Sequence, residues 1–261
     1  MKKFKFITLV LILLSCINIG TLLAAESNEK LLSREWSFAG LFGKFDRASL
    51  QRGYQVYREV CASCHSMKYL SYRNLTESGG PEFTEDEAKA IAASYEITDG
   101  PNDDGEMYTR PGRLADKFAS PYPNDKAAIA ANGGAYPPDM SVLVKARKGG
   151  ADYIYSVLMG YDNQPAGFEL EAGVYYNKFM DGNKIKMPKP LQDDLIEYSD
   201  GTQATEAQMA SDVVNFLTWS AEPHLEARHR IGFKVIIYLI ILSTLVFFSM
   251  RKLWSSVDSE K

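Results

Sequence analysis

Residues 61–65 of the chain read Cys61-Ala-Ser-Cys64-His65. This Cys-x-x-Cys-His pattern is the attachment signal of a c-type haem. Two thiols three positions apart can each add to one vinyl group of a porphyrin, and the histidine that follows is then held under the iron as its proximal ligand. The pattern therefore predicts one covalently attached haem c, with thioethers at Cys61 and Cys64 and with His65 on the iron.

The motif follows a predicted amphipathic helix over residues 47–60. Asp46 is suited to cap its N-terminus. Apolar side chains recur inside it at helical spacing, at Leu50, Tyr54, Tyr57 and Val60. Gly53 lowers the helix propensity of this segment. Close contact with another helix is one reason for a glycine there, and chance is the other.

The second axial ligand of the iron has to come from elsewhere in the chain. The other histidines, His224 and His229, lie just before an apolar segment and suit an interfacial position better than a haem site. Methionine is the alternative, and the best candidate is Met187, which lies in a rigid proline-bounded loop; Met140 comes second. Ligation by His and Met raises the reduction potential and closes the iron to exogenous ligands, which is the chemistry of an electron carrier.

The first 25 residues have the layout of a secretory signal peptide. Lysines start the chain, an apolar run follows, and small residues at Ala24 and Ala25 precede a cleavage site before Glu26. A retained N-terminal anchor and a lipoprotein signal ending at Cys16 are the alternatives. Cleavage at Glu26 leaves Cys61 and Cys64 as the cysteines of the mature chain, and their alternatives to haem are a small disulfide or a redox dithiol.

A second apolar segment covers residues 231–250. At about 1.5 Å per residue, a helix of this length spans about 30 Å, the thickness of the hydrocarbon core of a bilayer. A buried core helix is the alternative. The predicted signal peptide places residues 26–230 outside the membrane, so that residues 251–261 form a short cytoplasmic tail. The lysine-started signal favours a bacterial inner membrane, with the haem domain on the periplasmic side.

Charge is unevenly distributed in the predicted exported body. Residues 26–230 hold 22 Lys and Arg against 31 Asp and Glu, a net charge of −9. Residues 77–106 alone hold ten acidic side chains against one base, Lys89. This acidic segment is either a solvated surface or a docking face for a basic partner, because a concentrated field steers association. An acidic body without a basic patch gives no support for nucleic-acid binding.

The rest of the body reads as helices separated by long irregular segments. Helices are expected over residues 88–95, 125–131, 151–160 and 205–219, the first and last of them opened by capping boxes at Thr84–Glu87 and Thr205–Gln208. Residues 98–106 and 164–190 are rich in Gly, Pro and polar side chains and are expected to be irregular. The predicted fold class is a mostly α cytochrome c-type haem domain with long loop insertions and one C-terminal transmembrane helix.

Several segments, in this order, resemble the cytochrome c1 family. The similarity covers essentially the whole mature chain and rests on Trp36-Ser-Phe38, Asp46-Arg-Ala-Ser-Leu-Gln-Arg-Gly53, Val60-Cys-Ala-Ser-Cys-His-Ser-Met67, Pro137-Pro-Asp-Met-Ser141, Gly160-Tyr161, the Met187-Pro loop, and Asp200-Gly-Thr-Gln-Ala-Thr205 through Ala221-Glu-Pro223. The haem motif alone would not select this family.

The resemblance implies a role as the haem subunit of the cytochrome bc1 complex, ubiquinol–cytochrome c reductase. The haem would take single electrons from a Rieske iron–sulfur protein and pass them to a cytochrome c, beside a cytochrome b, in a complex that helps to generate the proton gradient. In the family, the positions matching His65 and Met187 are the axial ligands. The resemblance also favours the interpretation of the acidic segment as a docking face for cytochrome c. No catalytic residue is expected in a chain that transfers electrons only within the complex.

One position departs from the family pattern. Family members usually carry an arginine that pairs with a haem propionate where this chain has Ile129. Lys126, one helical turn earlier, can substitute, or the propionate is left to water. Three alternative functions remain beside the one that the resemblance implies: a haem peroxidase with an open distal site, an electron shuttle outside any complex, and a haem-free anchored protein with a disulfide.

Overall fold

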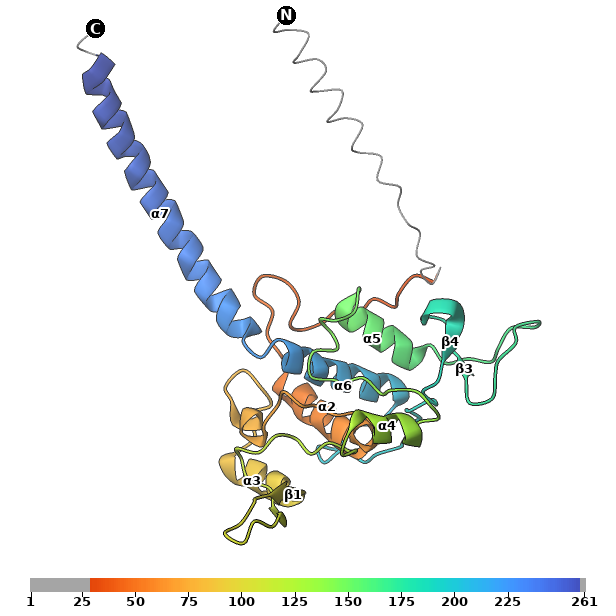
Figure 1. Cartoon of the computed structure of the whole chain (residues 1–261). Helices are drawn as coiled ribbons and strands as arrows, with labels where there is room; N and C mark the ends of the chain where they lie inside the picture. The colour runs from red at the N-terminus through yellow and green to blue at the C-terminus, as the bar shows by residue number, and fades with distance from the viewer. Residues whose placement is uncertain (1–28, 259–261) are drawn as a thin grey trace, which may run out of the picture.

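The computed structural model describes residues 29–258. The predicted signal peptide, residues 1–25, lies outside the described residues, as does the end of the predicted tail. Figure 1 shows a helical body from which one long helix projects. The body contains little sheet, so the mostly α prediction is confirmed.

Six α-helices and two small sheets make up the described part of the chain. The α-helices are α2 (Arg47–Glu59), α3 (Glu85–Ala93), α4 (Asp125–Ala131), α5 (Gly150–Met159), α6 (Glu206–Ala221) and α7 (Leu225–Asp258), joined by the 3₁₀ turns η1 (Cys61–Ser63), η2 (Tyr72–Thr76) and η3 (Asp181–Asn183). Each sheet is an antiparallel pair of strands: β1 (Glu96–Asp99) with β2 (Tyr108–Pro111), and β3 (Tyr175–Tyr176) with β4 (Lys184–Ile185).

The strands correct the expectation of purely irregular chain at two places. The predicted loop over residues 98–106 is part of a hairpin: its first two residues, Thr98 and Asp99, belong to β1, and the rest lies in the turn. Glu96 lies opposite Pro111 and Asp99 opposite Tyr108. The short β3–β4 pair interrupts the second irregular stretch. Neither pair showed the alternating apolar pattern of a half-buried strand, because both lie at the surface and the side chains of β1 and β2 are at most partly buried.

The predicted helix caps are confirmed except for one side chain. Asp46 accepts from the Ala48 and Ser49 N–H groups at the start of α2, and Thr84 with Glu87 forms the reciprocal capping box of α3, which begins three residues before the predicted start. Thr205 caps α6 by accepting from the Gln208 N–H. The Gln208 side chain does not return to Thr205 and donates instead to Asp212 (2.9 Å).

Helices α2 and α6 pack closely through Gly53. A Cβ atom added at Gly53 would lie 2.0 Å from the backbone oxygen of Asp212 and 2.8 Å from the Cβ of Phe216. Around this contact the apolar side chains of both helices, such as Leu50 and Val213, are fully buried. The helix-contact explanation for Gly53 is therefore confirmed, and the helix that leads into the Cys-x-x-Cys-His motif is fixed against the centre of the core.

Replacing Gly53 with alanine should therefore destabilise the protein. In an open helix this change stabilises by about 0.5–1 kcal/mol, but here the new methyl group must push α6 away, and overpacking of this kind costs about 1–3 kcal/mol. Urea unfolding of the full chain in detergent measures the change. Gly232→Ala in α7 is the matched control, since nothing lies within 4 Å of its added Cβ. Equal stability of the two variants would contradict the close contact.

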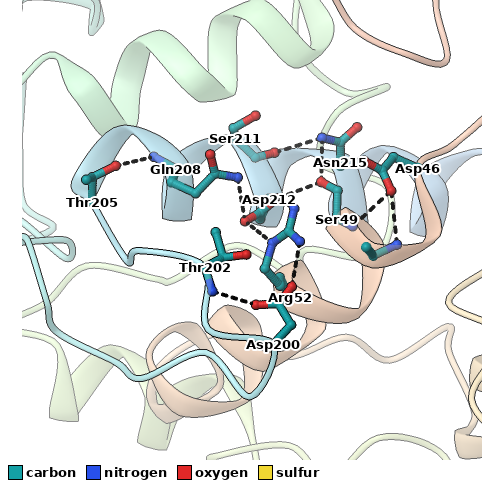
Figure 2. A network of polar contacts seen from close by, with 11 residues as sticks. Asp46, Ser49, Arg52, Asp200, Thr202, Thr205, Gln208, Ser211, Asp212 and Asn215 are labelled. Carbon is teal, nitrogen blue, oxygen red and sulfur yellow. Dashed lines mark hydrogen bonds and ion pairs between the residues drawn. The ribbon is translucent and has the colours of Figure 1, made fainter.

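A polar network links the same two helices (Figure 2). The Asp212 carboxylate, whose side chain is 1 % exposed, accepts from Arg52 Nε (2.9 Å) and Nη2 (3.1 Å) and from Ser49 Oγ (2.7 Å). Gln208 adds a further hydrogen bond to it. Arg52 also pairs with Asp200 at 2.8 Å, in the loop before α6. Every oxygen of the buried carboxylate thus has a donor, which is what makes a buried charge tolerable.

Helix α7 begins at Leu225, after a short break that follows the end of α6 at Ala221. Its residues Leu225–Ser255 are long and apolar enough to cross a membrane: the most apolar 18-residue stretch has a mean hydropathy of 2.4, and no part of that stretch is buried in the protein. The predicted span, residues 231–250, lies within it. The buried-core alternative is therefore wrong.

The first turn of α7 is fixed to the start of α2. Glu226 receives two hydrogen bonds from the Arg47 guanidinium, at 2.8 and 2.9 Å, and one from the Phe45 N–H at 2.9 Å. Glu222, at the end of α6, pairs with Lys145 and with Arg228 of α7. Charged side chains from both helices thus brace the junction between the body and α7.

Candidate haem site

The Cys-x-x-Cys-His segment forms a tight turn directly after α2. The N–H groups of Cys64 and His65 both donate to the carbonyl of Cys61, at 3.1 and 2.9 Å. Residues three apart lie on the same side of a 3₁₀ turn, so Cys61 and Cys64 share one side of η1. Both cysteines are free, and each residue is partly buried.

His65 is oriented by a backbone carbonyl. Its Nδ1 lies 2.8 Å from the carbonyl oxygen of Pro138. A carbonyl only accepts, so Nδ1 carries the proton and the lone pair is on Nε2. Burial lowers the pKa of His65, against the opposing effect of the Pro138 carbonyl. The ring is thus held neutral with one nitrogen oriented and the other available, which is how proteins prepare a histidine for a metal.

Asp139 fixes the loop that supplies this carbonyl. Its carboxylate accepts from Ser66 Oγ (2.9 Å), from the Lys68 N–H (2.8 Å) and from the Ser141 N–H (2.9 Å). Burial opposes ionisation, but these hydrogen bonds hold the pKa of Asp139 below its usual value. The segment after His65 and the loop around Pro138 are therefore one rigid unit.

Met140 belongs to the loop that holds His65. Its N–H donates to the Ser66 carbonyl at 2.8 Å, two residues after the Pro138 carbonyl that holds Nδ1. Its side chain is buried in the apolar core.

Met187 lies on a separate segment that three contacts hold. The Tyr161 hydroxyl donates to the Met187 carbonyl at 3.0 Å, and the Lys189 ammonium pairs with Glu206 at 2.7 Å. The Lys186 ammonium reaches the Gly133 carbonyl at 3.4 Å. The Met187 side chain is half-buried against the apolar core.

Helix α4 connects the two segments. Asp125, at its start, pairs with Lys68 from the segment after His65 (3.4 Å), and Gly133, just past its end, accepts from Lys186. Its N-cap is Asn124, which accepts from the Ala127 N–H. Ile129 lies between these ends and is exposed, as is Lys126. The site residues thus come from the motif turn and from the Met187 loop, on either side of α4.

Chemistry other than haem attachment fits the two thiols poorly. Burial raises the pKa of Cys61 to about 12, and the neighbouring Cys64 adds to this effect. Redox-active cysteines have lowered pKa values, so Cys61 lacks the feature of a redox-active thiol. The two distant histidines are not near the motif: His229 faces the Gly43 carbonyl (3.3 Å) at the start of α7, and His224 is exposed beside it.

A surface cavity of about 200 Å³ lies next to the motif but is not the haem site. It touches Ala62, between the cysteines, and its walls are aromatic rings, including Tyr57 and Phe118. Cys61, Cys64, His65 and Met187 do not line it. The candidate site is therefore defined by its donor atoms rather than by this cavity.

The acidic segment lies at the end of the body opposite the free end of α7 (Figure 1). It contains α3 and the first strand of the hairpin, β1, and its acidic side chains are exposed except for the partly buried Asp99. Two of its ten carboxylates pair with arginines outside it: Glu82 with Arg47 and Asp99 with Arg110. Lys89 pairs with Glu85. The remaining charge faces solvent.

The supporting roles of three positions could not be recognised from the sequence. The Pro138 carbonyl is a backbone group and carries no sequence signal. Asp139 carries a weak sequence signal. Asp side chains often accept a hydrogen bond from the N–H two residues later, an Asx turn, as Asp139 does from Ser141. The role of Tyr161 depends on a tertiary contact that spacing does not reveal.

The structure combines a helical body, a Cys-x-x-Cys-His turn with an oriented histidine, and one helix able to cross a membrane. These features together define the class of membrane-anchored cytochromes. The model of the Cytochrome C1 family matches residues 36–257. The chain therefore belongs to the cytochrome C1 family, whose members are haem proteins of respiratory electron transport.

Individual relatives agree with this assignment. A protein named cytochrome b/c1 from Bradyrhizobium diazoefficiens is 47% identical over 97% of this chain, which spans only 40% of that protein's length. Cytochrome c1-2, heme protein, mitochondrial, from Solanum tuberosum is 50% identical, over 91% of this chain and 90% of its own. The cytochrome b-c1 complex catalytic subunit, mitochondrial, of Candida albicans is 47% identical, over 91% and 82%.

Proposed function

We propose that this protein carries single electrons from a Rieske iron–sulfur protein to a cytochrome c, as the haem c subunit of a ubiquinol–cytochrome c reductase. The observation that carries the proposal is the geometry of His65, whose Nδ1 is held by the Pro138 carbonyl while Nε2 keeps its lone pair. Membership of the cytochrome C1 family and the names of the relatives support the same role.

The motif turn would hold one haem covalently. The S–H groups of Cys61 and Cys64 each add across one vinyl double bond, so that a C–S bond forms and the hydrogen goes to the other vinyl carbon without net oxidation. The bound haem supplies a one-electron iron couple. The shared side of η1 lets both thioethers form from one turn, immediately before the ligand His65.

His65 and Met187 would be the two axial ligands. The rigid loop around Pro138 keeps His65 neutral and oriented, and the contacts of Tyr161 and Lys189 hold the Met187 segment in place without using its sulfur. Met140 suits the distal position less well, because it belongs to the same loop that holds Nδ1 of His65. Two protein ligands leave no position for peroxide, so the role is that of a carrier rather than of a peroxidase.

The partners would be a cytochrome b and the Rieske protein in one membrane complex, with a cytochrome c as acceptor. The relatives named cytochrome b/c1 and cytochrome b-c1 complex subunit support the complex. The exposed acidic segment, on the end of the body away from α7, suits docking of a basic cytochrome c, and such docking should weaken as salt rises. The chain itself contributes no catalytic residue to quinol oxidation.

The proposed topology has four parts. Residues 1–25 are cleaved, residues 26–230 form the haem domain on the periplasmic side, residues 231–250 span a bacterial inner membrane, and residues 251–261 are cytoplasmic. The apolar surface of α7 supports the span. Sequencing the N-terminus of the purified protein checks the cleavage site, and protease digestion of sealed membranes checks which side holds the body.

The test of the carrier function begins with the purified membrane fraction. Haem that stays with the chain after denaturation, and is lost from the Cys61→Ala/Cys64→Ala double variant, would establish covalent attachment. Co-purification of a cytochrome b and an iron–sulfur protein, with rapid oxidation of the reduced haem by cytochrome c, would establish the role. A reduced wild type that binds carbon monoxide would instead indicate an open iron and refute the carrier proposal.

Ile129→Arg should raise the midpoint potential of the haem, because Ile129 is exposed on α4, beside the proposed site. The added cation favours the reduced, less positive iron. Because the added guanidinium is exposed and solvent and salt screen it, the shift should be on the order of tens of millivolts. A redox titration measures the shift, with Ile129→Gln as the uncharged control. An unchanged potential in the arginine variant would refute the expectation.

A further inference from the structure

The loop formed by residues 39–43 presents two apolar side chains to the outside of the body. Leu41 is 60 % exposed and Phe42 is 72 % exposed. The loop is closed rather than loose, since the Lys44 N–H donates to the Ser37 carbonyl at 2.9 Å across its base. A Cβ at Gly43 would lie 2.2 Å from the Phe38 oxygen, so the turn is tightly packed against its own base. The body thus holds these side chains in a defined place.

That place is beside the first turns of α7, on the side of the body toward which α7 runs (Figure 1). The Phe42 ring meets the Phe233 ring edge to face, with centroids 6.1 Å apart. One turn earlier, His229 Nδ1 lies 3.3 Å from the Gly43 carbonyl. The tip of the loop therefore lies beside Phe233 of α7.

The sequence of α7 gives the depth of that position. Arg228 and Arg230 are exposed and precede the apolar run, which begins at Ile231. Phe233 lies about 4.5 Å further along the axis than Arg230, at about 1.5 Å per residue. When α7 crosses a bilayer, basic side chains lie at the headgroups and the apolar run enters the hydrocarbon. Phe42, packed on Phe233, is then at the boundary between the two.

We propose that residues 39–43 insert the side chains of Leu41 and Phe42 into the lipid bilayer beside α7, as a second membrane contact of the haem domain. The exposed Lys44 next to the loop, together with Arg228 and Arg230, suits the phosphates of the lipid headgroups. Lipid is favoured over solvent as the neighbour because the loop continues the apolar surface of α7. The inference requires that α7 crosses a membrane and is independent of the haem and of its partners.

Spin labelling of the full chain tests this proposal. The protein, with the subunits that accompany it, is reconstituted in vesicles of phosphatidylcholine and phosphatidylglycerol, and a nitroxide is attached at Phe42→Cys. Val246→Cys, in the middle of the apolar run, and Met107→Cys, in the β1–β2 hairpin, give the lipid and water references; both native side chains are well exposed. The parent protein labelled in parallel measures any background from the native cysteines.

We expect oxygen to relax the label at position 42 more than a water-soluble nickel complex does. The label at position 246 should behave in the same way, and the label at position 107 should show the opposite preference. Preferential access of the nickel complex, as at position 107, would place the loop in water and overturn the proposal. Low access of both reagents would show that another subunit covers the loop, which also overturns it. Because no outcome depends on haem absorption, failure here is distinguishable from failure of the carrier function.

Discussion

Replacing Met187 with alanine is expected to lower the midpoint potential of the haem and to let the reduced iron bind carbon monoxide. Loss of the thioether removes a ligand that favours the reduced iron. The expected shift is on the order of 100 mV, a fraction of the roughly 0.8 V over which axial ligands set haem potentials. A redox titration and absorption spectra with and without carbon monoxide measure both effects on the same sample.

Two volume-conserving variants make this experiment specific. Leucine replaces methionine in a protein core at a cost that is usually below about 1.5 kcal/mol, but it cannot ligate iron. Met187→Leu should change the spectrum and the potential as the alanine variant does. Met140→Leu should leave both unchanged, because Met140 belongs to the loop that holds Nδ1 of His65 and is not the proposed ligand. The reverse pattern would assign the distal position to Met140, and a wild type that binds carbon monoxide would leave neither as a ligand.

Arg52→Met should destabilise the body far more than the loss of an exposed arginine does. The change leaves the Asp212 carboxylate, almost fully buried, without its cationic partner. Breaking a buried pair in this way costs about 3–5 kcal/mol. We expect about 3 kcal/mol, because Ser49 and Gln208 still donate to the carboxylate. Denaturant unfolding in detergent, followed by the fluorescence of the buried Trp219, gives the free energy.

The controls separate the buried charge from simple loss of an arginine. Arg58→Met breaks an exposed pair with Glu59 on the same helix and should cost less than about 1 kcal/mol. Adding Asp212→Leu to Arg52→Met removes the unpaired charge and should restore part of the lost stability. If the double variant is no more stable than Arg52→Met, the unpaired carboxylate is not the cause of the loss.

Local signals in the sequence predicted most of the helices. Asp46 and Thr84 cap α2 and α3 as expected, and the bounds of α4 agree with the prediction. The long apolar run likewise identified α7. Each of these features depends on residues within a few positions of one another, so one sequence suffices to find them. The hairpin flanking residues 98–106 was missed because its exposed strands bury no alternating face.

The site was predicted only as far as its chemistry is local. Cys61, Cys64 and His65 lie within one turn, and their spacing alone indicated a haem. The groups that orient His65 lie more than 70 residues away and act through a backbone carbonyl. Gln208 shows the same limit on a smaller scale: the capping-box pattern was present, but the buried carboxylate of Asp212 offered its side chain a better partner.

The braced junction between α6 and α7 has a consequence for how electrons arrive and leave. Glu226 is bonded to Arg47 and to the Phe45 N–H, so α7 and the helix that ends at the haem motif meet without a free joint. In the function proposed above, a haem domain attached in this way would keep one height above the bilayer and one tilt toward it. Its redox centre would not swing between donor and acceptor. Both partners would therefore travel to a stationary relay, and every encounter would take place at the same distance from the membrane plane.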